Sequence, residues 1–214
     1  MTAPCGHRGC LRPERESLLT WPTAVTVVRT LASVVLGLAG ITQGSLALLL
    51  WGLGVYWIGD MADGALARLL DRETRVGAVA DILSDRLCSA VFYCGLLTVL
   101  PDMAVPIGIY LVNFMLVDML LSLAFLAWPL SSPNYFYLVD RTLFLLNWSK
   151  VGKALNSALI ALLMILTELV WLSAGIALVV LGVKIGSLVR LSRLGLPMPS
   201  GCAAAAHRPL SPVV

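Results

Sequence analysis

Two short stretches, GDMADGALAR at residues 59–68 and GAVADILSDR at residues 77–86, set four aspartates in otherwise apolar sequence. Within each stretch the aspartates are three or four positions apart, so each pair shares one face of a helix. The two pairs are about equally distant from Arg72 along the chain. An antiparallel pair of helices joined near Arg72 therefore brings the four carboxylates together at one depth. They belong to Asp60, Asp63, Asp81 and Asp85.

The composition of the 214-residue chain excludes a soluble globular protein. Hydrophobic residues make up 59% and charged residues 13%, against about 45–50% and about 25% in soluble proteins. Several apolar runs approach the roughly 20 residues that a helix needs to cross a bilayer. We therefore expect an all-α membrane protein with six transmembrane helices, near 23–43, 46–70, 78–100, 104–128, 151–167 and 169–191. The formal charge of +3 gives no indication of a nucleic-acid partner.

The basic residues predict how the chain is oriented. With six spans, all 15 Lys and Arg residues fall on one face of the membrane or in the helix halves next to it. By the positive-inside rule that face is cytoplasmic, so both termini and the carboxylates lie on the cytoplasmic side of the cell inner or plasma membrane. The break near Glu168 is the weakest, because the surrounding apolar run holds no other charge. A single re-entrant stretch is the alternative there.

The ends of the chain differ from its middle. Residues 1–16 and 196–214 are rich in Pro, Ala, Gly and Arg, which is typical of mobile tails. We expect residues 17–195 to form the six-helix membrane domain between two mobile cytoplasmic tails. Cys5, His7 and Cys10 are interpreted as reduced, solvated tail residues rather than a metal knuckle, because no second pair stands at finger-like spacing.

Four carboxylates inside a membrane need compensating charge. Each costs about 2.5–3.5 kcal/mol near mid-helix, so four cost on the order of 10–14 kcal/mol. In our interpretation Arg68 and Arg86 supply two positive charges, whereas Arg29, Arg72 and Arg75 attract anionic substrates or anchor the interface. One or two hard divalent ions, magnesium or manganese, close the remaining gap. Two alternatives stay open: a carboxylate–arginine network that only joins helices, and a cation or proton transporter.

The residues around the carboxylates resemble a known signature. The pattern Asp60-x-x-Asp63-Gly64-x-x-Ala67-Arg68, eight residues, then Gly77-x-x-x-Asp81-x-x-x-Asp85 is similar, position for position, to that of the CDP-alcohol phosphotransferase family. The first span adds Pro22-Thr23-x-x-Thr26-x-x-Arg29. It resembles the Pro-Asn-x-x-Thr-x-x-Arg of many bacterial members, with Thr23 in place of the Asn. Together with the six spans, the resemblance covers most of residues 20–192.

The resemblance implies an enzyme that transfers a substituted phosphoryl group from a CDP-activated donor to an alcohol and releases CMP. It implies that Asp60, Asp63 and Asp81 hold the magnesium or manganese, and that Asp85 is the general base and a further metal ligand. The CDP-binding residues that follow from it are Thr26, Asp60, Gly64, Ala67, Arg68 and Gly77. The family resemblance also suggests a homodimer, in contact with membrane lipids.

Basic residues near the fifth span form the candidate acceptor site. Lys150 and Lys153 stand one turn apart at a helix start, with Arg141 nearby, and such a cluster can bind an acceptor phosphate. The sequence NWSKVGKALNS at 147–157 loosely resembles an element of glycerol-phosphate and phosphatidylglycerol-utilising members. Ordinary flanking charge is the alternative. Asp118 lies mid-span, either as a polar contact to the bundle interior or as an acceptor-site residue.

We therefore expect phosphatidyl transfer from CDP-diacylglycerol to a polar alcohol, with glycerol 3-phosphate as the first choice. The alternative acceptors are inositol phosphate, phosphatidylglycerol and an amino alcohol. A site at the cytoplasmic level of the bilayer suits this reaction, because a lipid donor stays in the membrane while a water-soluble acceptor arrives from the cytosol.

Overall fold

The structure, a computed structural model, describes residues 16–17, 20–156 and 158–197. This part of the chain is helical and contains no strand. Six of its helical stretches are long and apolar enough to cross a membrane, which confirms the predicted number of spans and the all-α class. The chain is an integral membrane protein. The tail residues Cys5, His7 and Cys10 lie outside the described residues.

The spans are built from one to five helical segments each. The first three and the last are single helices, the fourth covers Pro101–Ala127, and the fifth covers Lys150–Thr167. In chain order the segments are α1 (Trp21–Gln43), α2 (Leu46–Leu69), α3 (Arg75–Val99), η1 (Pro101–Met103), α4 (Ala104–Val112), η2 (Asn113–Val117), α5 (Asp118–Leu123), η3 (Ala124–Ala127), η4 (Pro133–Leu138), α6 (Arg141–Asn147), α7 (Lys150–Asn156), α8 (Ala158–Thr167) and α9 (Val170–Leu194).

Capping residues set the ends of the helices that carry the aspartates. Ser45 Oγ accepts a hydrogen bond from Leu48 N at the start of α2, and Thr74 Oγ1 accepts one from Gly77 N at 3.0 Å at the start of α3. Gly44 ends α1 with a φ of +59°, a left-handed conformation that glycine adopts without strain. The chain can therefore reverse tightly between the first two spans.

Glu168 separates the fifth and sixth spans. Its φ is +53°, and it lies between Thr167, where α8 ends, and Val170, where α9 begins. Because this backbone conformation cannot continue a right-handed helix, the chain turns back and α8 contacts α9. The stretches on either side of Glu168 are each long and apolar enough to cross a membrane, in agreement with the prediction of two spans here.

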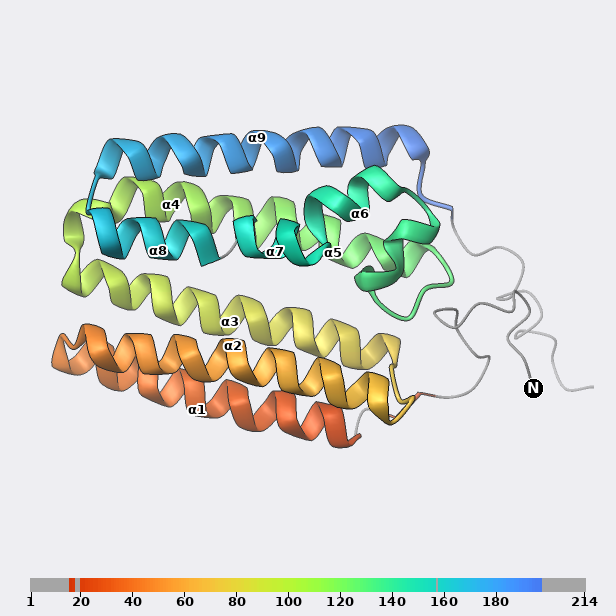
Figure 1. Cartoon of the computed structure of the whole chain (residues 1–214), viewed down its shortest axis with the longest axis horizontal. Coiled ribbons are helices and arrows are strands. Elements are labelled where there is room, and N and C mark those ends of the chain that lie inside the picture. Colours follow the sequence, from red (N-terminus) through yellow and green to blue (C-terminus); the bar gives the residue numbers. More distant parts are fainter. Residues whose placement is uncertain (1–15, 18–19, 157, 198–214) are drawn as a thin grey trace, which may run out of the picture.

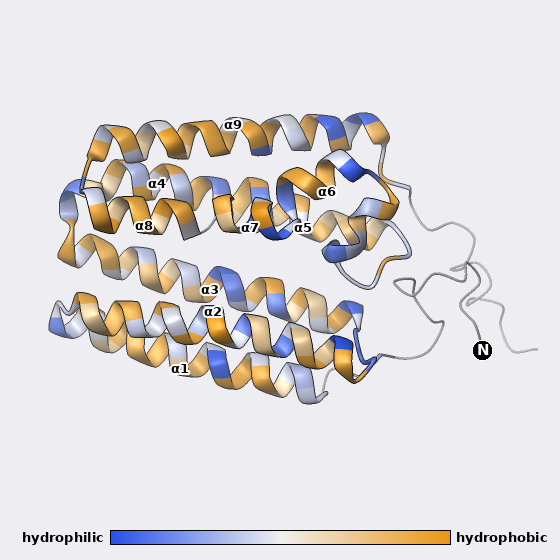
Figure 2. Ribbon diagram, in the orientation of Figure 1, coloured by the Kyte–Doolittle hydropathy of each residue, from blue (hydrophilic) through white to orange (hydrophobic). Residues whose placement is uncertain are grey.

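The spans lie alongside one another along the long axis of the molecule (Figure 1). The turns after α1, α3 and α8 share one end. The opposite end holds the turn between α2 and α3, the η4–α6 region, and both ends of the described chain. Figure 2 shows long hydrophobic stretches on α4, α8 and α9 and hydrophilic residues within α2 and α3. Buried polar residues also lie in α1, in the fourth span and in α9, so polar groups reach the interior of the bundle from several helices.

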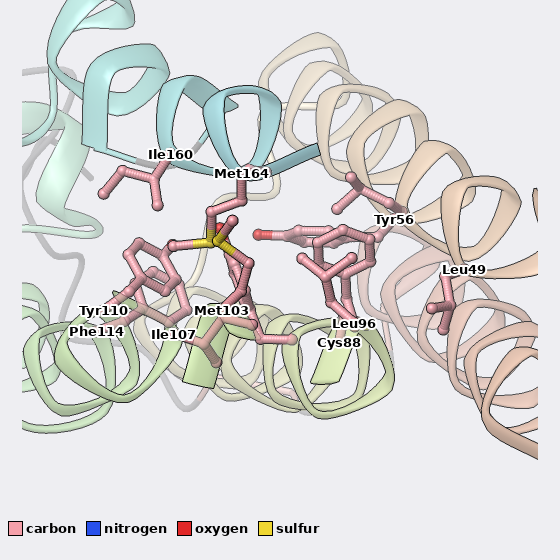
Figure 3. Packing of buried hydrophobic residues seen from close by; sticks show 14 of the residues in the cluster. Leu49, Tyr56, Cys88, Leu96, Met103, Ile107, Tyr110, Phe114, Ile160 and Met164 are labelled. Atoms are coloured by element: carbon pink, nitrogen blue, oxygen red, sulfur yellow. The ribbon is translucent and has the colours of Figure 1, made fainter. Parts of the chain in front are cut away.

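Two buried apolar clusters hold the helices together. The larger one joins the second, third and fourth spans to α8, and Figure 3 shows Ile160 and Met164 of α8 reaching toward Tyr110 and Met103 of the fourth span. The smaller one lies under the connection between the fourth and fifth spans and includes Phe136. Inside a membrane such packing stabilises through van der Waals contact rather than through exclusion of water.

The fourth span contains a π turn, η2, in place of regular α-helix. Its mark is a hydrogen bond from Asp118 N to Asn113 O, five residues back. In a regular α-helix two residues five apart point about 140° away from one another, whereas a π turn brings them onto one face. Asn113 and Asp118 can therefore face the same part of the bundle interior.

Candidate active site

One arginine of the first span contacts all four predicted aspartates. Arg29 Nε lies 2.8 Å from Asp63 Oδ2, and Nη2 lies 3.1 Å from Asp85 Oδ1 and 3.6 Å from Asp60 Oδ1. The same Nη2 donates to Asp81 Oδ1. Helices α2 and α3 therefore bring the four carboxylates together, as the spacing predicted, and α1 supplies the guanidinium around which they gather.

This arrangement corrects the expected charge balance. Arg29 is only 4% exposed, so it neither anchors the interface nor stands free to attract substrates. The expectation that Arg86 compensates the four aspartates is wrong, because Arg86 Nη2 pairs with Asp118 Oδ2 at 2.6 Å. Arg68 lies in the walls of two pockets that adjoin the carboxylates. Reasoning by sequence proximity chose the wrong arginine, because α1 reaches the site only through tertiary packing.

Asp63 is the most enclosed of the four carboxylates. Its residue is 4% exposed, and Oδ2 accepts from Arg29 Nε and, at 2.7 Å, from Thr26 Oγ1. Thr26 and Arg29 are on one face of α1, three positions apart. This threonine, which we expected to bind CDP, thus also holds a carboxylate in place.

Three of the carboxylates could hold a divalent ion between them. One oxygen each from Asp60, Asp63 and Asp81 lies within 4.8 Å of the others. The side chains of Asp60 and Asp81 are 37% and 36% exposed, so a ligand can approach them. Oxygen donors suit magnesium or manganese, and four carboxylates around one guanidinium carry an excess of negative charge. The donor set of these three carboxylates therefore fits a divalent cation.

A small pocket of about 80 Å³ adjoins Asp63 and Asp81. Most of the predicted nucleotide-binding residues line it, and Asp60 lies instead in the wall of a second cavity. Those around the small pocket are Thr26, Gly64, Ala67, Arg68 and Gly77. Most residues of the signature therefore converge on this pocket, although they come from three helices.

Gly64 and Gly77 line this pocket, and the space beside the two glycines differs. A Cβ at Gly64 would lie 3.4 Å from an Arg68 guanidinium nitrogen, so glycine keeps the pocket wall open without being required by packing. A Cβ at Gly77 would lie 2.8 Å from Thr74 Oγ1. Gly77 therefore makes room for the threonine that caps α3.

A larger cavity of about 710 Å³ adjoins the carboxylates, and Asp60, Asp81 and Asp85 are in its wall. Lys150 and Lys153, two of the predicted acceptor-binding residues, also line it. Arg141, the third, is exposed and is not among the lining residues. The structure thus brings the lysines to the carboxylates and leaves Arg141 outside.

Asp118 has two buried partners in the wall of the larger cavity. Besides Arg86, it accepts a hydrogen bond from Lys184 Nζ of α9, and Lys184 is 1% exposed. Ser122 Oγ lies 3.2 Å from Arg86 Nη2. These contacts support the view of Asp118 as a polar contact to the bundle interior, and they tie the third, fourth and sixth spans together.

Several cavity residues were missed by the sequence reasoning. From the sequence, Lys184 counts only as a basic residue near the cytoplasmic face, Asn147 only as the first residue of the element at 147–157, and Asn113 carries no prediction. A signal for Lys184 existed, since an aspartate inside a span requires a cation within reach. For Asn147, whose Nδ2 lies 3.1 Å from Ser187 Oγ, periodicity carries no comparable signal.

Comparisons with known proteins place the chain among its relatives. The sequence model of the CDP-alcohol phosphatidyltransferase family matches residues 19–186. The chain is 39% identical over 79 residues to the phosphatidylinositol phosphate synthase of Mycobacterium tuberculosis, covering 36% of this chain and 35% of that protein. It is 40% identical over 78 residues to the protein of the same name from Mycobacteroides abscessus, covering 35% of this chain and 34% of that protein. The matched region thus spans about a third of the length of these curated relatives. No solved structure matches the chain significantly.

Proposed function

We propose that this chain, which belongs to the CDP-alcohol phosphatidyltransferase family, transfers a phosphatidyl group from CDP-diacylglycerol to a phosphorylated alcohol and releases CMP. The observation that carries the proposal is the position of the carboxylates. Asp81 lines both the small pocket, where the signature residues gather, and the larger cavity, where the lysines lie. A donor on one side and an acceptor on the other would meet at the aspartates.

The small pocket is the proposed nucleotide side. Arg68 can donate to phosphate oxygens, and the open backbone at Gly64 allows a close approach. Magnesium or manganese, held by Asp60, Asp63 and Asp81, would supply positive charge to the diphosphate and to the leaving CMP. Arg29 and Thr26 hold the Asp63 carboxylate in place for that role.

Asp85 is the proposed general base. It lines the larger cavity, and Arg29 Nη2, at 3.1 Å from Oδ1, fixes its orientation. An acceptor hydroxyl bound in the cavity would give its proton to the Asp85 carboxylate while the oxygen attacks the β-phosphorus of the donor. The CMP phosphate then leaves with the bonding electron pair.

The acceptor side of the proposal rests on Lys150 and Lys153. Both residues line the cavity that also has Asp60 and Asp81 in its wall, and lysine side chains can bind the phosphate of an acceptor. The names of the relatives support inositol phosphate. The element at 147–157 supports glycerol 3-phosphate, the acceptor expected first. We propose that the site faces the cytoplasm, in keeping with the basic residues at its end of the bundle.

The test is CMP release by the purified protein in detergent, supplied with CDP-diacylglycerol and each acceptor in turn. We expect release with one phosphorylated alcohol, only when magnesium or manganese is present.

Asp85→Asn should lower turnover by at least about 100-fold while CDP binding persists. Asp102→Asn, an exposed aspartate at the far end of the bundle, is the matched control and should retain activity. Absence of CMP release with every acceptor would refute the proposal, and ion flux in proteoliposomes would then favour a transporter.

A further inference from the structure

The connection between the fourth and fifth spans is firmly packed. Phe136 in η4 is fully buried, and its ring centroid lies 5.1 Å from that of Trp128 and 4.6 Å from that of Trp148. Aromatic pairs at such separations stabilise their geometry. The residues next to Phe136 are therefore held in defined positions.

Two side chains of this connection reach opposite sides of the site. Tyr135 Oη donates to Glu73 Oε2, in the turn between α2 and α3. Asn134 Oδ1 accepts from Lys153 Nζ of α7 at 3.0 Å. The connection is thus tied both to the helices that carry the aspartates and to the helix that carries the candidate acceptor lysines.

Ser132 and Asn134 line both the small pocket and the larger cavity. Ser132 is 7% exposed, and within the described part of the chain its buried hydroxyl has no hydrogen-bond partner. A buried hydroxyl without a partner costs free energy, so such groups in native proteins call for an explanation. Ser131 has an equally buried hydroxyl without a partner, but only Ser132 lines the two spaces, where a ligand atom can complete its hydrogen bonding.

The donors at this junction indicate what the ligand is. An ammonium group can only donate, so the Asn134 amide oxygen faces Lys153 and its NH₂ group is left to donate elsewhere. Arg68 also lines both spaces and has no acceptor atom. A hydroxyl, an amide NH₂ and a guanidinium that share one junction match a ligand with several acceptor oxygens and negative charge.

We infer that Ser132 and Asn134 form a phosphate-binding wall at the junction of the two spaces, a role that rests on the proposed function. Two phosphates can reach this place: the diphosphate of the CDP-activated donor, from the small pocket, and the phosphate of the acceptor, from the cavity. Both offer the same oxyanion chemistry, and binding measurements with separate ligands distinguish them.

The test compares Ser132→Ala with Ser131→Ala in the full chain, in detergent with magnesium. Ser131 is a matched control, because it is also 7% exposed and its hydroxyl also has no partner among the described residues, but it lines neither space. The dissociation constants of CDP, inositol 1-phosphate and glycerol 3-phosphate are measured by calorimetry. Loss of one hydrogen bond to a charged phosphate should weaken binding about tenfold for Ser132→Ala, and Ser131→Ala should bind as the wild type does.

The ligand whose binding is weakened shows which phosphate contacts Ser132. Weaker binding of CDP indicates the donor diphosphate, and weaker binding of a phosphorylated alcohol indicates the acceptor phosphate. Asn134→Asp is the second variant, since its carboxylate still accepts from Lys153 but replaces the NH₂ donor with negative charge. It should weaken the same ligand more strongly, at an unchanged melting temperature. Unchanged affinities in both variants, or a wild type that binds none of the ligands, would overturn the inference. A wild type that binds CDP but releases no CMP would refute the proposed function instead.

Discussion

Arg29 Nε and Asp63 Oδ2 lie 2.8 Å apart, and both residues are only 4% exposed. The contact joins the first span to the second. Because the Nη2 of the same guanidinium reaches Asp81 and Asp85 on the third span, a single side chain joins three helices. The position of every carboxylate in the site therefore depends on Arg29.

Replacing Arg29 with Gln should destabilise the protein and make its stability depend on divalent ions. Breaking a buried ion pair by removing one partner costs about 3–5 kcal/mol, and here four carboxylates lose their shared guanidinium. We expect a lower melting temperature in detergent with EDTA, and partial recovery with magnesium. A variant that melts like the wild type in EDTA would show that Arg29 does not compensate the aspartates.

Gly59→Ala should displace Arg29. A Cβ at Gly59 would lie 2.6 Å from Arg29 Cβ and 2.5 Å from its Cδ. Because Arg29 Cβ is next to the backbone, rotating the guanidinium cannot relieve the overlap. We expect the free energy of unfolding to fall by about 1–3 kcal/mol and CMP release to fall as well. Gly54→Ala is the control on the same helix, since a Cβ there has no atom within 4 Å. Equal behaviour of the two variants in melting and activity assays would contradict the prediction.

Asp118→Ala should destabilise the protein more than Lys184→Met. The first change leaves Arg86 and Lys184 buried without their shared carboxylate, at a cost of about 3–5 kcal/mol. The second leaves the Arg86–Asp118 pair intact and removes the excess positive charge. Thermal unfolding in detergent measures the order, and a reversed order would mean that Lys184, rather than Asp118, is the central member of the cluster.

Tyr135 should ionise at unusually high pH. Partial burial, the hydrogen bond to Glu73 and the negative charge of Glu73 together raise the pKa of Tyr135 to about 12, because each favours the neutral phenol. At pH 11 only about a tenth of Tyr135 should be ionised, whereas a tyrosine with the usual pKa of about 10 is mostly phenolate. The difference in absorbance at 295 nm between wild type and Tyr135→Phe isolates this residue. Glu73→Gln should lower the pKa toward 10, and an unchanged titration would exclude the contact.

The sequence was sufficient for the spans and for the convergence of the aspartates. Hydropathy predicts the six spans, and the equal distances from Arg72 predict the matching depths of the carboxylates, because both depend on local geometry. The partner of those carboxylates could not be predicted in this way. Arg29 reaches them only because α1 packs against α2 and α3, and because Gly59 leaves room for its side chain.

The acceptor side was the least predictable from sequence. Lys150 and Lys153 carried a signal as charges at a helix start, and the structure places them on the cavity. Ser132 and Asn134 carried none, since Ser, Pro and Asn between two spans are typical of an ordinary loop. Their position depends on Phe136 packing between two tryptophans, a contact between residues that periodicity does not relate.

The π turn at Asn113–Val117 has an evolutionary consequence. Relative to an uninterrupted helix, such a turn accommodates one additional residue, and a single codon insertion is enough to create it. Everything that follows in the fourth span is then rotated by about 100°, and in this rotated part Asp118 meets Arg86 and Lys184. One inserted amino acid can thus change which neighbours every later residue of the span meets, and its loss would turn Asp118 away from Arg86 and Lys184.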